Sequence, residues 1–141
     1  MKNTTIFIIL VCFFTLFNVN ILLAEQAKEE IAIQAAKDWL SLVDEERYGE
    51  SWETAAIFFK NAVQKVQWIT SMNGFRKPLG KLLERKIKNS QYMTTLPGAP
   101  DGEYVVIQFE TSFENKKSSI ETITPMLDKD GKWRTSGYYI T

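Results

Sequence analysis

The chain has 141 residues, and its first 24 differ in composition from the rest, because they hold 17 of the 63 apolar residues, the only cysteine and a single charge. The other 117 residues contain neither cysteine nor histidine, and their 17 acidic and 16 basic residues give a formal net charge of −1. This composition excludes disulfides, thiolate or imidazole metal sites and triads with an imidazole base. It also provides no basic surface of the kind that binds nucleic acid, and it implies no cofactor.

Residues 1–24 have the order of a secretory signal peptide. Lys2 precedes a 12-residue run from Ile6 to Phe17 that is apolar except for one threonine, and the small residue Ala24 stands before an acidic stretch. A membrane span takes about 20 apolar residues, so this run is short for one. We therefore expect cleavage after Ala24 and export to the periplasm or cell envelope of a bacterium, where a domain without disulfides is common. An uncleaved membrane anchor, lengthened by residues 21–23, is the alternative.

Residues 25 to about 77 have apolar residues at helical spacing. We predict a first helix from Glu25 to Asp44, a second helix capped by Ser51, and a third that restarts near Asn61 and ends before Pro78. The first helix has two adjacent apolar stripes, formed by Ile31, Ala35, Trp39 and Leu42 and by Ala32, Ala36, Leu40 and Val43. The later helices have an apolar face that includes Trp52, Phe59, Val63, Val66, Trp68, Met72 and Phe75.

Residues from about 81 to 141 have the pattern of strands and turns. We predict strands over 82–93, 103–113, 120–127 and 133–140, with a tight turn at 128–131. Pro125 requires its strand to lie at an edge or to contain a bulge. Helices followed by an antiparallel meander predict one α+β domain over 25–141, with about three helices packed on a curved four-stranded sheet in a cone-like arrangement.

The four tryptophans and three arginines are the most informative side chains for a site. We interpret the tryptophans mainly as core residues, some of which also line a cavity between helices and sheet. Arg76, Arg85 and Arg134 are interleaved with apolar residues, and each is compatible with a surface ion pair. Arg76, at the end of the third helix, is also placed to point into the mouth of the cone and to bind a carboxylate or carbonyl.

Glu121 has two interpretations that depend on which face of its strand is buried. If the odd positions point inward with Ile123, Glu121 faces the cavity and is a candidate general base. If Ile120 and Met126 point inward, Glu121 is solvated, which we prefer, and we interpret Asp44 as part of a solvated cluster at a helix end. The candidate ligand-binding residues are Trp39, Trp52, Trp68, Arg76, Tyr104 and Glu121.

Several segments resemble an uncharacterised bacterial family, domain of unknown function 4019. They are residues 36–44, 48–52, 76–80, 96–104 and 130–134, which read AKDWLSLVD, YGESW, RKPLG, LPGAPDGEY and DGKWR. The resemblance covers nearly all of residues 27–141 and implies an exported protein with no assigned activity. The order of elements also resembles the nuclear-transport-factor-2-like superfamily, which includes ketosteroid isomerases and dehydratases as well as non-catalytic binding and dimerisation modules. A resemblance of fold transfers no activity, and no catalytic residue of those enzymes matches here.

Three hypotheses about function follow. The first is a non-catalytic exported module that binds a small apolar or amphipathic molecule or forms a homodimer. The second is a cavity-based isomerase or hydrolase with Glu121 as base and Arg76 as electrophilic partner. The third is an envelope interaction protein that is attached to the membrane only if residues 1–24 are retained. The absence of histidine, cysteine and an acid–base pair favours the first.

Overall fold

The computed structural model describes the backbone of residues 2–141 and the side chains of residues 21–141. This part of the chain forms four α-helices, a 3-10 turn and four strands. In chain order they are α1 (Lys2–Asp44), α2 (Tyr48–Glu53), α3 (Ile57–Ala62), α4 (Lys65–Phe75), η1 (Lys77–Leu79), β1 (Leu82–Met93), β2 (Tyr104–Phe113), β3 (Lys116–Leu127) and β4 (Trp133–Ile140). The predicted α+β class and the four-strand meander are confirmed.

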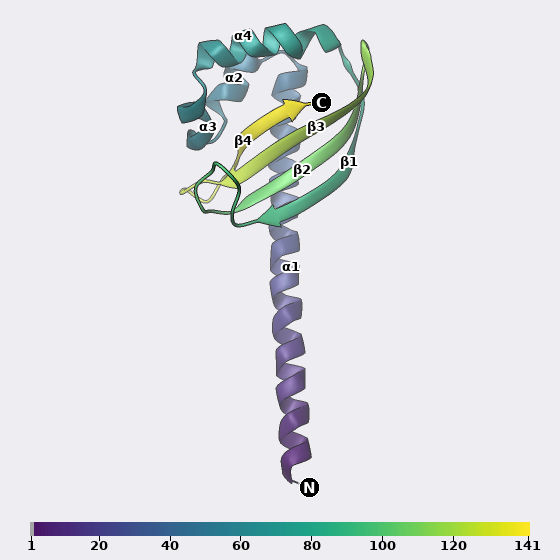
Figure 1. Cartoon of the computed structure of the whole chain (residues 1–141), viewed down its shortest axis with the longest axis vertical. Helices are drawn as coiled ribbons and strands as arrows, with labels where there is room; N and C mark the ends of the chain where they lie inside the picture. The colour runs from purple at the N-terminus through teal and green to yellow at the C-terminus, as the bar shows by residue number, and fades with distance from the viewer. Residues whose placement is uncertain (1) are drawn as a thin grey trace.

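The strands form one antiparallel sheet in the order β1-β2-β3-β4. Figure 1 shows this sheet curled in front of α1, with α2, α3 and α4 at one end of the domain. Two residues of β1, Leu83 and Lys88, have no partner in β2, because the register shifts by one residue at each. A third shift lies between Thr124 and Pro125 in the pairing of β3 with β4. Pro125 therefore lies on an inner strand beside a bulge, whose extra residue is Ser136 of β4, and this satisfies the constraint predicted for it.

The core lies between α1 and the concave face of the sheet. Alternate residues of β2 from Val105 to Phe109 point into it, and Ile123 of β3 joins them. On α1 the stripe of Ala32, Ala36, Leu40 and Val43 is buried together with Trp39, whereas Ile31 is largely exposed. Of the other predicted stripe, Trp39 is buried, Ala35 and Leu42 are half-buried, and only Ile31 is wrong. Only a narrow strip of a helix contacts a sheet, and the small side chains at 32 and 36 allow α1 to lie close.

The helices that follow α1 in the chain, α2 to α4, differ from the prediction in their boundaries. Ser51 is not an N-cap but lies inside α2, where its hydroxyl donates to the Tyr48 carbonyl over 2.8 Å. Before α4, the Gln64 amide N–H donates to the side chain of Gln67 over 3.3 Å, which satisfies one free donor of the helix start. Val66 and Phe75 are exposed, whereas Trp68 and Met72 of the same helix are buried.

The amino-terminal part of α1 extends away from the domain (Figure 1). Residues 21–23 are exposed on it, and Lys28 and Glu29 make its first contacts with the sheet. The Glu29 carboxylate accepts from the Ser90 hydroxyl over 3.0 Å and from the Tyr92 amide over 2.9 Å. In the part of the chain that the structure describes, no helix has both the length and the apolar character that crossing a bilayer requires. The predicted signal peptide falls mostly on residues 1–20, which lie outside the described side chains.

Candidate functional site

Two arginines and two carboxylates meet at the concave face, near the end of α1. We call Asp44, Arg76, Arg85 and Glu121 the charged cluster. They come from four different elements: Asp44 ends α1, Arg76 follows α4, Arg85 lies on β1 and Glu121 on β3. Their side chains are 18%, 3%, 11% and 0% exposed, respectively. Buried charges of this kind persist when each is paired and hydrogen-bonded, and here two positive charges balance two negative ones.

Glu121 is fully buried and accepts four hydrogen bonds. Arg85 donates to both of its oxygens, from Nε over 2.6 Å and from Nη2 over 3.1 Å. The hydroxyls of Thr111 and Tyr138 each donate to one oxygen over 2.7 Å. The preferred interpretation of Glu121 as a solvated side chain is wrong, since the odd positions of β3 point inward with Ile123.

Asp44 is bound by both arginines. Its Oδ2 accepts from Arg85 Nη1 over 2.7 Å, and its Oδ1 accepts from Arg85 Nη2 and Arg76 Nη2, each over 3.0 Å. Arg76 also donates to the Gly80 carbonyl over 2.9 Å, and its guanidinium lies 4.3 Å from the ring centre of Phe113. Asp44 is therefore not part of a solvated cluster. Arg76 does bind a carboxylate and a carbonyl, but both belong to its own chain.

The surroundings of the cluster raise the pKa values of Arg85 and of the neighbouring phenol of Tyr138. Burial opposes the charge of Arg85, but hydrogen bonds to Asp44 and Glu121 outweigh that effect and raise its pKa. Burial raises the pKa of Tyr138 well above its usual value, and the negative charge of Glu121 adds to this. Tyr138 therefore remains a hydrogen-bond donor to Glu121 at neutral pH.

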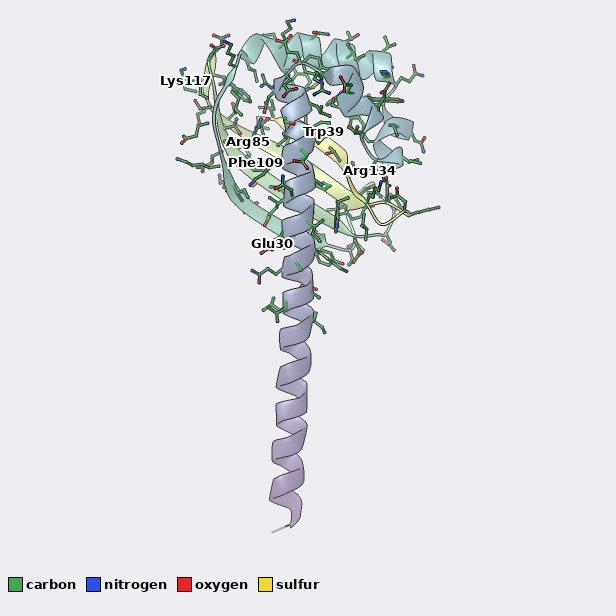
Figure 2. The ribbon with its side chains drawn as sticks, turned by 180° about the vertical axis from the view of Figure 1, so that it is seen from behind. Glu30, Trp39, Arg85, Phe109, Lys117 and Arg134 are labelled. Carbon is green, nitrogen blue, oxygen red and sulfur yellow. The ribbon has the colours of Figure 1, made fainter. Side chains whose placement is uncertain are left out.

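An aromatic cluster adjoins the charged cluster through Tyr138. We define it as Phe59 of α3, Trp68 of α4, Trp39 of α1 and Tyr138 of β4. The ring centres of Trp39 and Tyr138 are 5.4 Å apart, and those of Phe59 and Trp68 are 5.1 Å apart, both pairs edge to face. Trp39 and Trp68 are satisfied at Ser51, where their indole N–H groups donate to its carbonyl over 2.7 Å and to its hydroxyl over 3.0 Å. Figure 2 shows Trp39, Arg85 and Phe109 gathered where α1 crosses the sheet.

The structure brings together four of the six predicted candidates. Trp39 and Trp68 lie in the aromatic cluster, and Arg76 and Glu121 lie in the charged cluster. Trp52 is half-buried at the side, where its indole N–H donates to the Val63 carbonyl over 2.7 Å. Tyr104 lies outside the core on the other face of β2, where it is buried and its hydroxyl donates to the Pro100 carbonyl.

Sequence reasoning missed four members or neighbours of the site: Asp44, Arg85, Thr111 and Tyr138. Their contacts join residues far apart in the chain, since Arg85 is 41 residues from Asp44 and 36 from Glu121. A weak signal for Arg85 is that Leu83 and Ile87, two positions to either side of it on the strand, are apolar. Arg134 was interpreted as a surface ion-pair residue, and it does pair with Asp128 and Asp130 at 2.9 and 2.7 Å.

The arrangement can bind and orient, but its acid–base groups are all engaged with one another. No group of metal-binding side chains occurs among the described residues. At 128–131 the structure has the predicted tight turn, closed by a 2.9 Å hydrogen bond from the Gly131 amide to the Asp128 carbonyl.

The chain is similar to known proteins in fold and in family. A 2.5 Å structure of a protein from Catenulispora acidiphila has a TM-score of 0.56 with 11% identity, over 84% of this chain and 93% of that one. This likeness extends to the fold alone. No curated protein matches the chain. The family described as "Protein of unknown function (DUF4019)" matches residues 35–138, a range that includes all of the charged and aromatic clusters, and the chain therefore belongs to that family.

Proposed function

We propose that this protein is an exported, non-catalytic module that binds a small amphipathic molecule at its concave face. The observation that carries the proposal is the contact of the aromatic cluster with the charged cluster at Tyr138. Aromatic rings beside a few fixed polar groups are the usual composition of a small-molecule site. An amphipathic molecule matches both parts, because its apolar body suits the rings and its polar end suits the arginines.

The hydrogen bonding of Glu121 supports binding rather than catalysis. A general base needs a free lone pair directed at its substrate. Both oxygens of Glu121 already accept two hydrogen bonds each, and two of these four come from the guanidinium of Arg85. Export is supported separately, by the leader-like residues 1–24 and by the exposure of residues 21–23 on α1.

A cavity-based isomerase or hydrolase is the second candidate, and the burial of Glu121 is the observation in its favour. An enclosed active site excludes water, which strengthens the interactions of a carboxylate with its substrate. The weakness of this candidate is that Arg76, its electrophilic partner, is bound to Asp44 and Gly80.

The test is native mass spectrometry of the full chain after expression and export in a bacterium. We expect the protein to begin at Glu25 and to carry a co-purified small molecule. In the Trp68→Leu variant, which shortens the aromatic cluster, that added mass should be lost. In the matched control Trp133→Leu, which alters a partly buried tryptophan outside the cluster, it should remain. A ligand-free wild-type protein would contradict binding, and retention of residues 1–24 in the membrane fraction would contradict cleavage.

A further inference from the structure

Arg76 and Arg85 together form the kind of site that binds a free carboxylate. Two guanidinium groups converge on the two oxygens of Asp44 with three hydrogen bonds of 2.7–3.0 Å, and one of them binds in the bidentate mode. Arginine is the residue best suited to such recognition, because its planar donors match the spacing of carboxylate oxygens. The carboxylate that occupies this site is part of the chain.

Asp44 is the member of the charged cluster that is easiest to displace. Its side chain is 18% exposed, more than any other in the cluster. It is also the last residue of α1, where the free carbonyls form the negative end of the helix dipole and disfavour a carboxylate. Any carboxylate between the two arginines meets the same field, so displacement depends on the partial exposure of Asp44, which lets its side chain turn outward to water.

The site has donors that Asp44 does not use. Arg76 Nε and the Tyr48 hydroxyl are both buried, and neither has a hydrogen-bond partner among the described residues. Arg76 Nε belongs to the guanidinium that binds Asp44, and Tyr48 lies close enough to Arg76 to feel its charge. Burial and the charge of Glu46 raise the pKa of Tyr48, and the nearby positive charge of Arg76 lowers it. Buried polar groups are rarely left without partners, so these two donors point to a further acceptor.

We propose that the Arg76–Arg85 pair is a binding site for a small carboxylate, which the chain fills with its own Asp44 until an external carboxylate replaces it. The exchange keeps the buried charge balanced, because one carboxylate leaves as another enters. Phe113, stacked on Arg76, and Tyr138 of the aromatic cluster give the external carboxylate an apolar neighbourhood. The inference rests on the proposed function and names the polar group of its ligand.

The first experiment removes the internal carboxylate with Asp44→Ala and measures the melting temperature in formate, acetate and chloride at matched ionic strength. We expect about 100 mM formate to raise the melting temperature by roughly 4 °C or more above the value in chloride. The matched control is Asp130→Ala, which removes the exposed carboxylate that Arg134 binds and should respond equally to formate and chloride. If Asp44→Ala folds in formate but not in chloride, that outcome also supports the proposal. An equal response to formate and chloride, or failure to fold in either, overturns the proposal.

The second experiment tests exchange in the wild-type protein. We expect acetate to shift the Nε resonance of Arg76 in a saturable way, and the Arg134 resonance to shift little. If acetate stabilises Asp44→Ala but never shifts Arg76 in the wild type, Asp44 is a permanent occupant and exchange is wrong. Both experiments use simple anions, so their failure leaves the co-purified ligand of the proposed function to be judged separately.

Discussion

Arg85 and Arg134 each bind two carboxylates, but Arg134 and one of its two partners are more exposed to water. Arg85 joins Asp44 to the fully buried Glu121, and its own side chain is 11% exposed. Arg134, itself 27% exposed, joins the nearly buried Asp128 to Asp130, which is 51% exposed, at the β3–β4 turn. The distances are similar in the two sets, from 2.6 to 2.9 Å. What differs is the water around them, and this difference decides what each set contributes.

An exposed ion pair contributes little to stability because water surrounds it. A buried pair is different, because removing one partner leaves the other charge buried and costs much stability. At the surface, solvent and salt screen the attraction, and fixing two long side chains costs entropy. In the interior, the attraction mainly offsets the cost of removing the charges from water, so loss of one partner leaves the other unpaired. The charged cluster is therefore expected to hold α1, β1 and β3 together as one cooperative unit, whereas the Arg134 set fixes only its own turn.

The largest expected effect is that of Arg85→Met. This change leaves Glu121 buried without its guanidinium, and we expect a loss of about 3–5 kcal/mol in the free energy of unfolding. Denaturant unfolding monitored by tryptophan fluorescence measures it. The control Arg134→Met should cause a far smaller loss, and similar losses in the two variants would break the comparison.

A double-mutant cycle of Arg85→Met and Glu121→Met should show strong coupling. Replacing both residues removes the unpaired charge, while Asp44 stays paired with Arg76, so the double variant should recover part of the stability. We expect a coupling energy of about 1–3 kcal/mol from the four unfolding curves. The same cycle on Arg134 and Asp130 should be close to additive, and additivity at Arg85 would show that the buried set is not one unit.

High pH should weaken the domain through Tyr138. The fold raises the pKa of Tyr138, so above pH 10 the unfolded chain loses the phenol proton before the folded chain does. Stability is therefore fully present below pH 10 and falls as the pH rises, by at most about 1.4 kcal/mol per pH unit for one group. Tyr138→Phe should give a flatter profile between about pH 10 and pH 12. An unchanged slope would assign the loss to other groups, such as Tyr48, Tyr92 and Tyr104, whose pKa values are also raised.

The smallest expected effect is a gain from Glu46→Gly. Glu46 has a φ of 59° after the end of α1, a conformation that disfavours residues with a side chain. Its ion pair with Lys77 is exposed on both sides. If exposed pairs contribute as little as the comparison implies, glycine should stabilise the domain by up to about 1 kcal/mol, measured by thermal unfolding. A net loss would show that the pair outweighs the backbone strain.

The sequence predicted the fold better than the site, for reasons visible in single residues. The bounds of β1 and β4 match the predicted strands because Gly, Pro and Asp mark the turns beside them. In β3 the alternation failed to decide the face, since Thr122 is buried on one side of the strand and Ile123 on the other. The predictions for Asp44 and Ser51 rested on local rules for helix ends. In the structure, both residues instead accept hydrogen bonds from distant parts of the chain, Asp44 from two arginines and Ser51 from two indole groups. Such long-range partners leave no local pattern.

The two residues of β1 without partners in β2 affect how this edge of the sheet can pair with another chain. A straight edge strand presents a continuous row of free amide and carbonyl groups to any other strand, which is how sheets polymerise. Leu83 and Lys88 interrupt that row and divide the regular pairing with β2 into two short stretches, residues 84–87 and 89–93. At the opposite edge, the Ala56 amide already donates to the Thr135 carbonyl of β4 over 2.9 Å. Both edges of the sheet thus have an interruption in the row of backbone groups that another strand would need for edge-to-edge pairing.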